Sequence, residues 1–161
     1  MSWIRFPPGA PSFLINVLAE GSMTRINLIP PTELYDQHLI AEYREIRLLT
    51  SLMRRMFATS GATKAKIPSK FTLNAGHVTF FKDKGCYINK RYKNLIVEMR
   101  IRGFTPHHTE IDTTVWPTGF FNDWEPSERD CNIVRQRIAE RIAQKPSWYR
   151  YYGKSTERTT S

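Results

Sequence analysis

The stretch Glu33–Phe57, ELYDQHLIAEYREIRLLTSLMRRMF, carries the clearest periodic pattern in the sequence. Its apolar residues recur at the spacing that places side chains on one side of an α-helix. Thr32 is a residue type that caps helices, and the acidic Glu33 and Asp36 suit the positive end of a helix dipole. We therefore expect a long first helix from about Glu33 to the mid-fifties, buried through Leu39, Tyr43, Ile46, Met53 and Phe57.

Two further helices are predicted downstream. The second ends at Gly103 and has an apolar stripe consisting of Ile88, Tyr92, Leu95, Ile96 and Met99. The third has Pro126 at a first helical position and stops at Pro146, and its buried stripe is Val134, Ile138 and Ile142.

The segments between these helices read as loops. Residues 60–70 form a basic, turn-rich loop, 71–81 are a short buried segment of undetermined type, and 105–123 form a long loop. A tail rich in aromatic and basic residues begins at Ser147. The sequence therefore predicts an all-α, mostly helical fold, with one compact domain of three principal helices.

Composition restricts the class of protein and its partner. The chain has 161 residues, and its 24 Lys and Arg against 15 Asp and Glu give a net charge of +9. This excess favours a polyanion, usually nucleic acid, over the alternative of a generic basic protein. We expect no membrane partner, because no apolar run is long enough to span one. Cys86 and Cys131 show neither a disulfide framework nor zinc spacing, which fits a reducing cytoplasm.

Residues 1–22 differ from the rest of the chain. They are rich in proline, and their two charges, Arg5 and Glu20, cancel, so residues 23–161 carry the whole +9. A signal peptide is rejected, because the apolar run Phe13–Ala19 is short, contains Asn16 and follows three prolines. We interpret 1–22 as a non-native or removed extension and 23–161 as the functional domain.

The third helix and the tail offer a nucleic-acid contact surface. Arg137 and Arg141 lie one turn apart, and the tail Trp148–Lys154, WYRYYGK, alternates rings with cations. Rings stack on exposed bases while Arg and Lys meet phosphates. The alternative is a tail that docks on the core through its aromatic residues. Both arrangements are compatible if alternate rings point inward to the core and outward to the nucleic acid.

Catalytic signals are weaker when the residues are considered alone. His38, Glu42 and Glu45 share one edge of the first helix, and the simplest interpretation is a solvated face with salt bridges. There is no catalytic-triad order and no phosphate loop, and the pair His107-His108 is too little for a metal site. We expect no metal and no cofactor.

Five blocks, in order, resemble the phage endonuclease V family of pyrimidine-dimer DNA glycosylases. The resemblance covers about residues 23–154 and leaves 1–22 outside. The blocks are MTRINL (23–28), DQHL (36–39), AEYRE (41–45), AGHVTFF (75–81) and IAQKPSWYRYYGK (142–154).

The resemblance implies a mechanism without a metal. The initiating methionine is removed, and the α-amine of Thr24 displaces the base at the anomeric carbon of the dimer's 5′ sugar. An imine forms, Glu45 serves as the essential carboxylate, and β-elimination nicks the strand. An α-amine suits this role, because its pKa of about 8 leaves more of it neutral than a lysine.

The resemblance also implies DNA contacts. They fall on Arg25, His38, Arg44, Arg137 and Arg141, and in the tail on Trp148, Tyr149, Arg150, Tyr151 and Lys154. Two positions depart from the family. Members of the family often have an arginine shortly after the catalytic glutamate. Arg47 either takes the place of that arginine one position earlier, or its contact with DNA is lost in this chain. Tyr92 stands where the phage enzyme has a pocket glutamine.

The start of the functional chain decides whether this chemistry is available, because an imine requires a primary amine. In a chain that begins at Met1, the Thr24 nitrogen is an unreactive amide. Three explanations are open. Translation starts at Met23 and the methionine is then excised, or the extension is cleaved, or the protein binds DNA without catalysis. We favour the first. We predict a cytoplasmic, monomeric repair enzyme without an obligate protein partner, acting on damaged double-stranded DNA. The alternatives are a non-catalytic basic DNA-binding protein and an abasic-site lyase without dimer preference.

Overall fold

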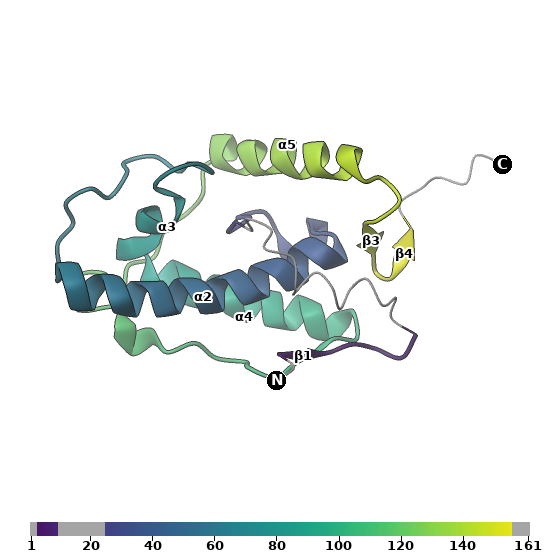
Figure 1. Ribbon diagram of the computed structural model, residues 1–161, viewed down its shortest axis with the longest axis horizontal. Helices are drawn as coiled ribbons and strands as arrows, with labels where there is room; N and C mark the ends of the chain where they lie inside the picture. The colour runs from purple at the N-terminus through teal and green to yellow at the C-terminus, as the bar shows by residue number, and fades with distance from the viewer. Residues whose placement is uncertain (1–2, 10–24, 156–161) are drawn as a thin grey trace.

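The computed structural model describes residues 3–9 and 25–155, and this part of the chain is mostly helical (Figure 1). Three long helices dominate: α2 (Asp36–Ser60), α4 (Gly85–Ile101) and α5 (Glu128–Gln144). The short elements are α3 (His77–Phe80) and the 3-10 turns η1 (Pro31–Glu33), η2 (Phe81–Asp83) and η3 (Thr113–Val115). The predicted mostly-α fold with three principal helices is confirmed.

Helices α2 and α4 lie side by side and build the centre of the core (Figure 1). The rings of Tyr43 and Tyr92 stack between them, with centroids 5.6 Å apart. Both predicted stripes are buried, apart from Phe57, which is partly buried. The undetermined segment 71–81 contains α3 and packs Phe71, Phe80 and Phe81 into the same core.

The predicted start of the first helix is wrong. Helix α2 begins at Asp36, its N-cap is Tyr35, and no side chain caps it. Thr32 lies in η1, and the next residue after this turn, Leu34, is extended and fully buried. The Leu34 carbonyl accepts a hydrogen bond from Arg102, at the end of α4, at 2.7 Å. A long-range contact has therefore taken the carbonyl that a continuous helix would use.

The predicted start of α5 is also corrected. Pro126 precedes the helix, and Ser127 is the N-cap: its hydroxyl accepts a hydrogen bond from Asp130 N, while the Asp130 carboxylate accepts one from Ser127 N. This capping box satisfies two backbone donors that a proline at the first helical position would not. The helix ends at Gln144, before Pro146, as predicted.

Two small antiparallel pairs complete the described structure. β1 (Ile4–Arg5) pairs with β2 (Thr105–Pro106), and β3 (Arg150–Tyr151) pairs with β4 (Lys154–Ser155). The predicted loop 105–123 is irregular apart from β2 and η3. Cys86 and Cys131 are free thiols. In the ranges that the structure describes, no helix is long and apolar enough to cross a membrane.

Candidate functional site

Glu42 and Glu45 lie about one turn apart on α2, yet their surroundings differ. Glu42 is completely buried. Its carboxylate accepts hydrogen bonds from Arg91 Nε at 2.7 Å, from Arg91 Nη2 at 2.9 Å and from Asn27 Nδ2 at 3.1 Å. The interpretation of this edge as a solvated face is therefore wrong for Glu42, whose carboxylate is fully occupied in a structural contact.

Glu45 is half-buried, and no described residue donates a hydrogen bond to it or forms an ion pair with it. Burial raises the pKa of the Glu45 carboxyl above its ordinary value, the charges of Arg25 and Arg44 oppose that rise, and Glu42 adds to it. Helix α2 thus places the Glu45 carboxylate near the guanidinium groups of Arg25 and Arg44, without a hydrogen bond or ion pair to any residue that the structure describes.

The segment that follows Thr24 is held by the 71–77 region. Arg25 Nε donates to the Leu73 carbonyl at 2.7 Å, and Ile26 N donates to Nε2 of His77 at 3.0 Å. His77 Nδ1 lies 2.8 Å from the Thr72 carbonyl, which only accepts, so Nδ1 carries the proton and Nε2 is the acceptor. Burial, with a smaller contribution from Arg25 and Arg137, lowers the pKa of His77 to about 4 and keeps the ring neutral.

The other end of the same segment is also fixed. Besides the Asn27–Glu42 bond, the Ile29 carbonyl accepts from Arg91 Nη1 at 2.5 Å. Leu28 between them has a φ of 60°, a conformation that a non-glycine residue keeps only where its surroundings over-determine it. Residues 25–29 are therefore anchored at four points. Thr24, to which Arg25 is bonded, lies outside the described residues.

Helix α5 adds a basic cluster beside this segment. The pKa of Arg137 is lowered by burial and then by the like charges of Arg141 and Arg25. Arg141 in turn is close enough to lower the pKa of His38. Three guanidinium groups from two segments therefore converge, which is an arrangement that favours an anionic ligand such as a DNA phosphate.

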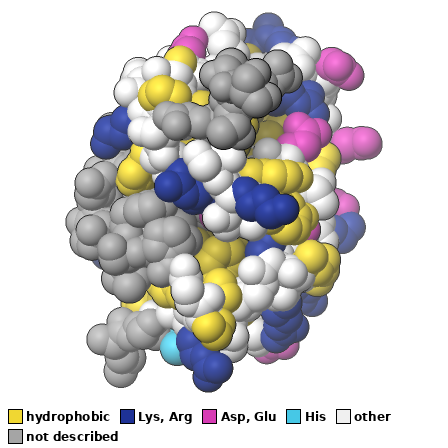
Figure 2. Space-filling model, turned by 90° about the vertical axis from the view of Figure 1, so that its right-hand side faces the viewer, with side chains coloured by type: hydrophobic (Ala, Val, Ile, Leu, Met, Phe, Trp, Pro, Cys, Tyr) yellow, Lys and Arg dark blue, Asp and Glu magenta, His cyan; other side chains and the backbone are white. Residues whose placement is uncertain are grey.

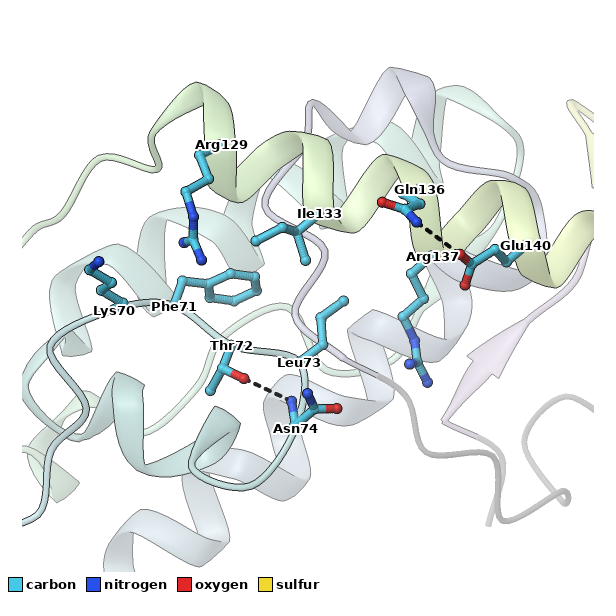
Figure 3. Close-up of a pocket in the computed structure, with 10 residues that line it drawn as sticks. All are labelled: Lys70, Phe71, Thr72, Leu73, Asn74, Arg129, Ile133, Gln136, Arg137 and Glu140. Carbon is cyan, nitrogen blue, oxygen red and sulfur yellow. Dashed lines mark hydrogen bonds between the residues drawn. The ribbon is translucent and has the colours of Figure 1, made fainter.

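A groove of about 510 Å³ extends this cluster between α5 and residues 70–74. Figure 3 shows Arg129 and Arg137 reaching from α5 toward that segment, with Phe71 and Ile133 between them. The lining residues are Lys70, Phe71, Thr72, Leu73, Asn74, Arg129, Ile133, Gln136, Arg137 and Glu140. Figure 2, which views the end of the molecule that carries β3 and β4, shows Lys and Arg side chains distributed among hydrophobic ones.

A comparison with protein-family models matches residues 23–112 to the family described as pyrimidine dimer DNA glycosylase. The chain belongs to this family. It is therefore a DNA-repair protein of the glycosylase class, directed at DNA that carries ultraviolet-induced pyrimidine dimers. The match contains Thr24, Arg25, His38, Arg44 and Glu45, whereas residues 1–22, α5 and the tail lie outside it.

In this glycosylase the tail docks partly inward. The Tyr149 ring is buried and stacks on His38, with centroids 4.9 Å apart and an interplanar angle of 10°. Gln37 holds the backbone beside it, donating to the Trp148 carbonyl at 2.5 Å and accepting from Arg150 N at 2.9 Å. The alternative of a docked tail therefore holds for Tyr149. His38 Nδ1 is buried without a hydrogen-bond partner among the described residues, and burial lowers the pKa of His38 to about 4.

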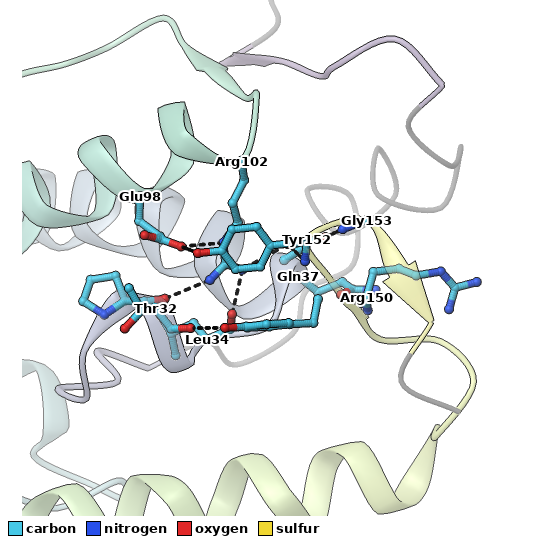
Figure 4. A network of polar contacts seen from close by, with 11 residues as sticks. Thr32, Leu34, Gln37, Glu98, Arg102, Arg150, Tyr152 and Gly153 are labelled. Atoms are coloured by element: carbon cyan, nitrogen blue, oxygen red, sulfur yellow. Dashed lines mark hydrogen bonds and ion pairs between the residues drawn. The ribbon is translucent and has the colours of Figure 1, made fainter. Parts of the chain in front are cut away.

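A polar network that the sequence did not suggest fixes the β3–β4 hairpin (Figure 4). The buried Arg102 side chain donates to Asp36 at 3.0 Å and to Glu98 at 2.8 Å. Asp36 also accepts from the backbone nitrogens of Tyr152 at 3.1 Å and Gly153 at 2.8 Å. No motif could have revealed this network, because its members come from helix ends and a turn that are far apart in the sequence.

The remaining predicted residues are placed apart from the cluster. Arg47 is two residues after Glu45, hence on nearly the opposite side of α2, and its guanidinium lies 5.3 Å from the centre of the Trp3 ring. Lys154 borders a separate hollow beside Tyr35 and Tyr151. Tyr151 remains 42% exposed, although its hydroxyl donates to the Thr32 carbonyl at 2.8 Å.

Proposed function

We propose that this glycosylase excises pyrimidine dimers through an imine with the α-amine of Thr24 and then nicks the strand by β-elimination. The observation that carries the proposal is the four-point anchoring of residues 25–29 beside Glu45, whose carboxylate has no hydrogen bond or ion pair with a described residue. A chain end is normally mobile, and a nucleophile gains effective concentration only when its position is fixed. The anchors supply that restraint one residue away from the proposed nucleophile.

The proposed chemistry uses only groups of this chain. The neutral amine attacks the sugar C1′, and the base departs with the electron pair of the glycosidic bond. The first amine proton goes to the departing base and the second to the sugar O4′, whose bond to C1′ breaks to give the imine. Removal of a C2′ proton then expels the 3′ phosphate with the electron pair of its bond to C3′. Glu45 opposes the positive charge that develops on the sugar and imine, and it moves the C2′ proton. Its raised pKa, caused mainly by burial, favours a carboxylate that accepts protons.

Arg25, Arg137 and Arg141 are proposed to bind the phosphates that flank the lesion, and Arg44 to position the damaged nucleotides. The groove along α5 is proposed to continue this contact with the backbone, because it joins the cluster at Arg137 and is lined by further cations. We propose that the protein acts as a monomer in the cytoplasm. The exposed rings of the tail, rather than the buried Tyr149, are the ones that we assign to DNA contact.

A non-catalytic DNA-binding role is the second candidate, and one observation favours it. Residues 3–9 pack onto the domain, so the chain that begins at Met1 has a docked leader and an amide at Thr24. In that form the protein would bind DNA but form no imine.

One experiment separates the two candidates. Residues 24–161 and residues 1–161 are each incubated with ultraviolet-irradiated duplex and borohydride, which reduces an imine to a stable bond. Covalent adducts and nicking with the short form alone support the imine route. Adduct-free, intact DNA with both forms would overturn the enzymatic proposal. A duplex that carries an abasic site, run in parallel, shows whether the lyase requires a dimer.

A further inference from the structure

Residues 3–9, which precede the family match, contribute to the core of the domain. Ile4 is only 1% exposed and belongs to the main hydrophobic cluster. Its strand β1 pairs with β2, with Ile4 opposite Pro106 and Arg5 opposite Thr105. A side chain this buried would leave a cavity if the leader were removed, because its neighbours belong to the helical core.

The backbone of Trp3 is bound by two different parts of the domain. Its carbonyl accepts from the Tyr43 hydroxyl of α2 at 2.9 Å and from His107 N at 3.0 Å. Its ring meets His108 edge-on, with centroids 6.2 Å apart, and lies under the Arg47 guanidinium. Arg47, for which the sequence suggested a DNA contact, therefore contacts the N-terminal segment 3–9. We call this segment the leader, and the surface of the domain that binds it the seat of the leader.

The next residues extend the same contact. Phe6 packs edge-on against Phe104, with ring centroids 5.8 Å apart. Pro7 lies against Gly103, where an added Cβ would approach the Pro7 ring to 3.3 Å. A peptide that adds a strand is a general mode of recognition, and here β2 provides the partner strand while Gly103 and Phe104 contact the side chains that follow β1.

Residues 3–9 lie away from the proposed active site. In Figure 1, β1 lies at one edge of the molecule and α5 at the opposite edge, with α2 and α4 between them. Arg47 and Glu45 occupy nearly opposite sides of α2, so the seat of the leader and the site carboxylate are separated by the helix itself. Residues 3–9 therefore dock on the side of α2 that faces away from Glu45.

We propose that residues 103–108, with Tyr43 and Arg47, form a peptide-binding surface whose occupant is the chain's own leader, and that residues 3–9 stay bound when the chain is opened before Thr24. The leader then need not be absent from the working protein. Hydrolysis of the bond between Met23 and Thr24 adds one water, leaves a carboxylate on Met23 and frees the amine of Thr24. Only this consequence for the amine rests on the proposed function, since the binding of the leader does not.

The test uses the full chain with a protease recognition sequence placed so that cleavage occurs directly before Thr24. After cleavage, gel filtration under native conditions is expected to show the leader peptide in the same peak as the domain, and denaturant is expected to release it. Separate elution under native conditions would overturn the proposal. The borohydride assay on the same cleaved sample keeps the two proposals apart: adducts without a retained leader refute only this inference, and a retained leader without adducts refutes only the imine route.

A matched pair of variants locates the contact. Ile4→Ser and Arg5→Ser introduce the same side chain on opposite faces of β1, one buried and one exposed. After cleavage, the first is expected to lose the leader from the peak and the second to retain it. Hydrogen exchange at His107 N in the uncut chain gives a reading that does not depend on cleavage. Exchange there should be at least tenfold slower in Arg5→Ser than in Ile4→Ser, and equal rates would contradict the proposed seat.

Discussion

The backbone nitrogen of Ile26 donates a hydrogen bond to Nε2 of His77 at 3.0 Å, two residues after the proposed nucleophile. His77 is only 4% exposed, and its other ring nitrogen is bound to the Thr72 carbonyl at 2.8 Å. A ring fixed at both nitrogens cannot rotate, so the segment bonded to Thr24 is fixed relative to the core. We therefore expect His77 to position the proposed nucleophile rather than to contact the reacting atoms.

We predict that His77→Leu slows imine formation by about 100-fold while DNA affinity changes little, because displacement of a reacting group by about 1 Å costs that much. His77→Gln is the control, since its side-chain oxygen can accept from Ile26 N, and it should recover part of the rate. The measurement is single-turnover borohydride trapping with residues 24–161, alongside binding by fluorescence anisotropy. Equal trapping rates in a folded His77→Leu protein would show that the anchor is not needed.

The two glutamates of α2 should separate catalysis from stability. Glu45→Gln is expected to abolish nicking and retain DNA binding, with no loss of stability, because the charged carboxylate is already disfavoured by burial. Glu42→Gln breaks the buried ion pair with Arg91 and should lower the free energy of unfolding by about 3 kcal/mol. Urea unfolding and a nicking assay on both variants check the contrast. A fully active Glu45→Gln protein would remove Glu45 from the mechanism.

Two arginines on α5 should differ in their effect on DNA binding. Arg137 lies in the cluster, whereas Arg135 is engaged by Glu33 at 3.0 Å. Removal of a phosphate contact lowers the slope of log affinity against log salt by about 1. Arg137→Gln should show that loss on irradiated duplex, and Arg135→Gln should match the unaltered protein. The same slope in all three proteins would place the DNA elsewhere.

Stability should fall as the pH is lowered from about 6.5 to about 4. Burial lowers the pKa of both His38 and His77 to about 4, so the unfolded chain binds protons in this window that the folded chain does not. A pKa change of this size corresponds to about 3 kcal/mol for each histidine, and the loss is complete below about pH 4. Above about pH 6.5 both histidines are neutral in either state and contribute no slope.

Urea unfolding between pH 4 and 7 measures this dependence. The background is Glu45→Gln, because the raised pKa of Glu45 acts with the opposite sign. The further change His77→Gln should reduce the difference in the free energy of unfolding between pH 6.5 and pH 4 by about 3 kcal/mol, since it removes one of the two titrating groups. An unchanged dependence would mean that His77 is protonated in the folded protein.

Periodicity found the long helices because their burial follows from local spacing. It missed the start of α2, where Arg102 takes the carbonyls of Pro31 and Leu34. It also misjudged the start of α5, where Ser127 and not Pro126 begins the cap. Both errors lie at helix ends, which depend on individual hydrogen bonds rather than on a repeated pattern.

The sequence predicted some residues of the candidate site and missed others. The resemblance singled out Glu45 and its basic neighbours, and the family match includes this part of the chain. The same reasoning missed the anchor His77, although it lies in the block AGHVTFF that carried the resemblance. It left open whether Arg47 contacts DNA or that contact is lost, and it did not foresee that the side chain lies over Trp3. Neither role shows in the sequence, because each depends on a partner more than 40 positions away.

The sequence by itself determined the helical class, the excess of positive charge and the family, because composition and short motifs carry that information locally. Tertiary structure decided between two carboxylates one helical turn apart: Arg91 and Asn27 bind Glu42, whereas no residue that the structure describes bonds to the Glu45 carboxylate. It also decided that residues 3–9 dock on the domain, since Ile4 is buried where β1 pairs with β2, a strand that is distant in the sequence. Burial and hydrogen bonding between distant residues are properties of the folded chain. They distinguish a helix face that is only solvated from one that forms a candidate site.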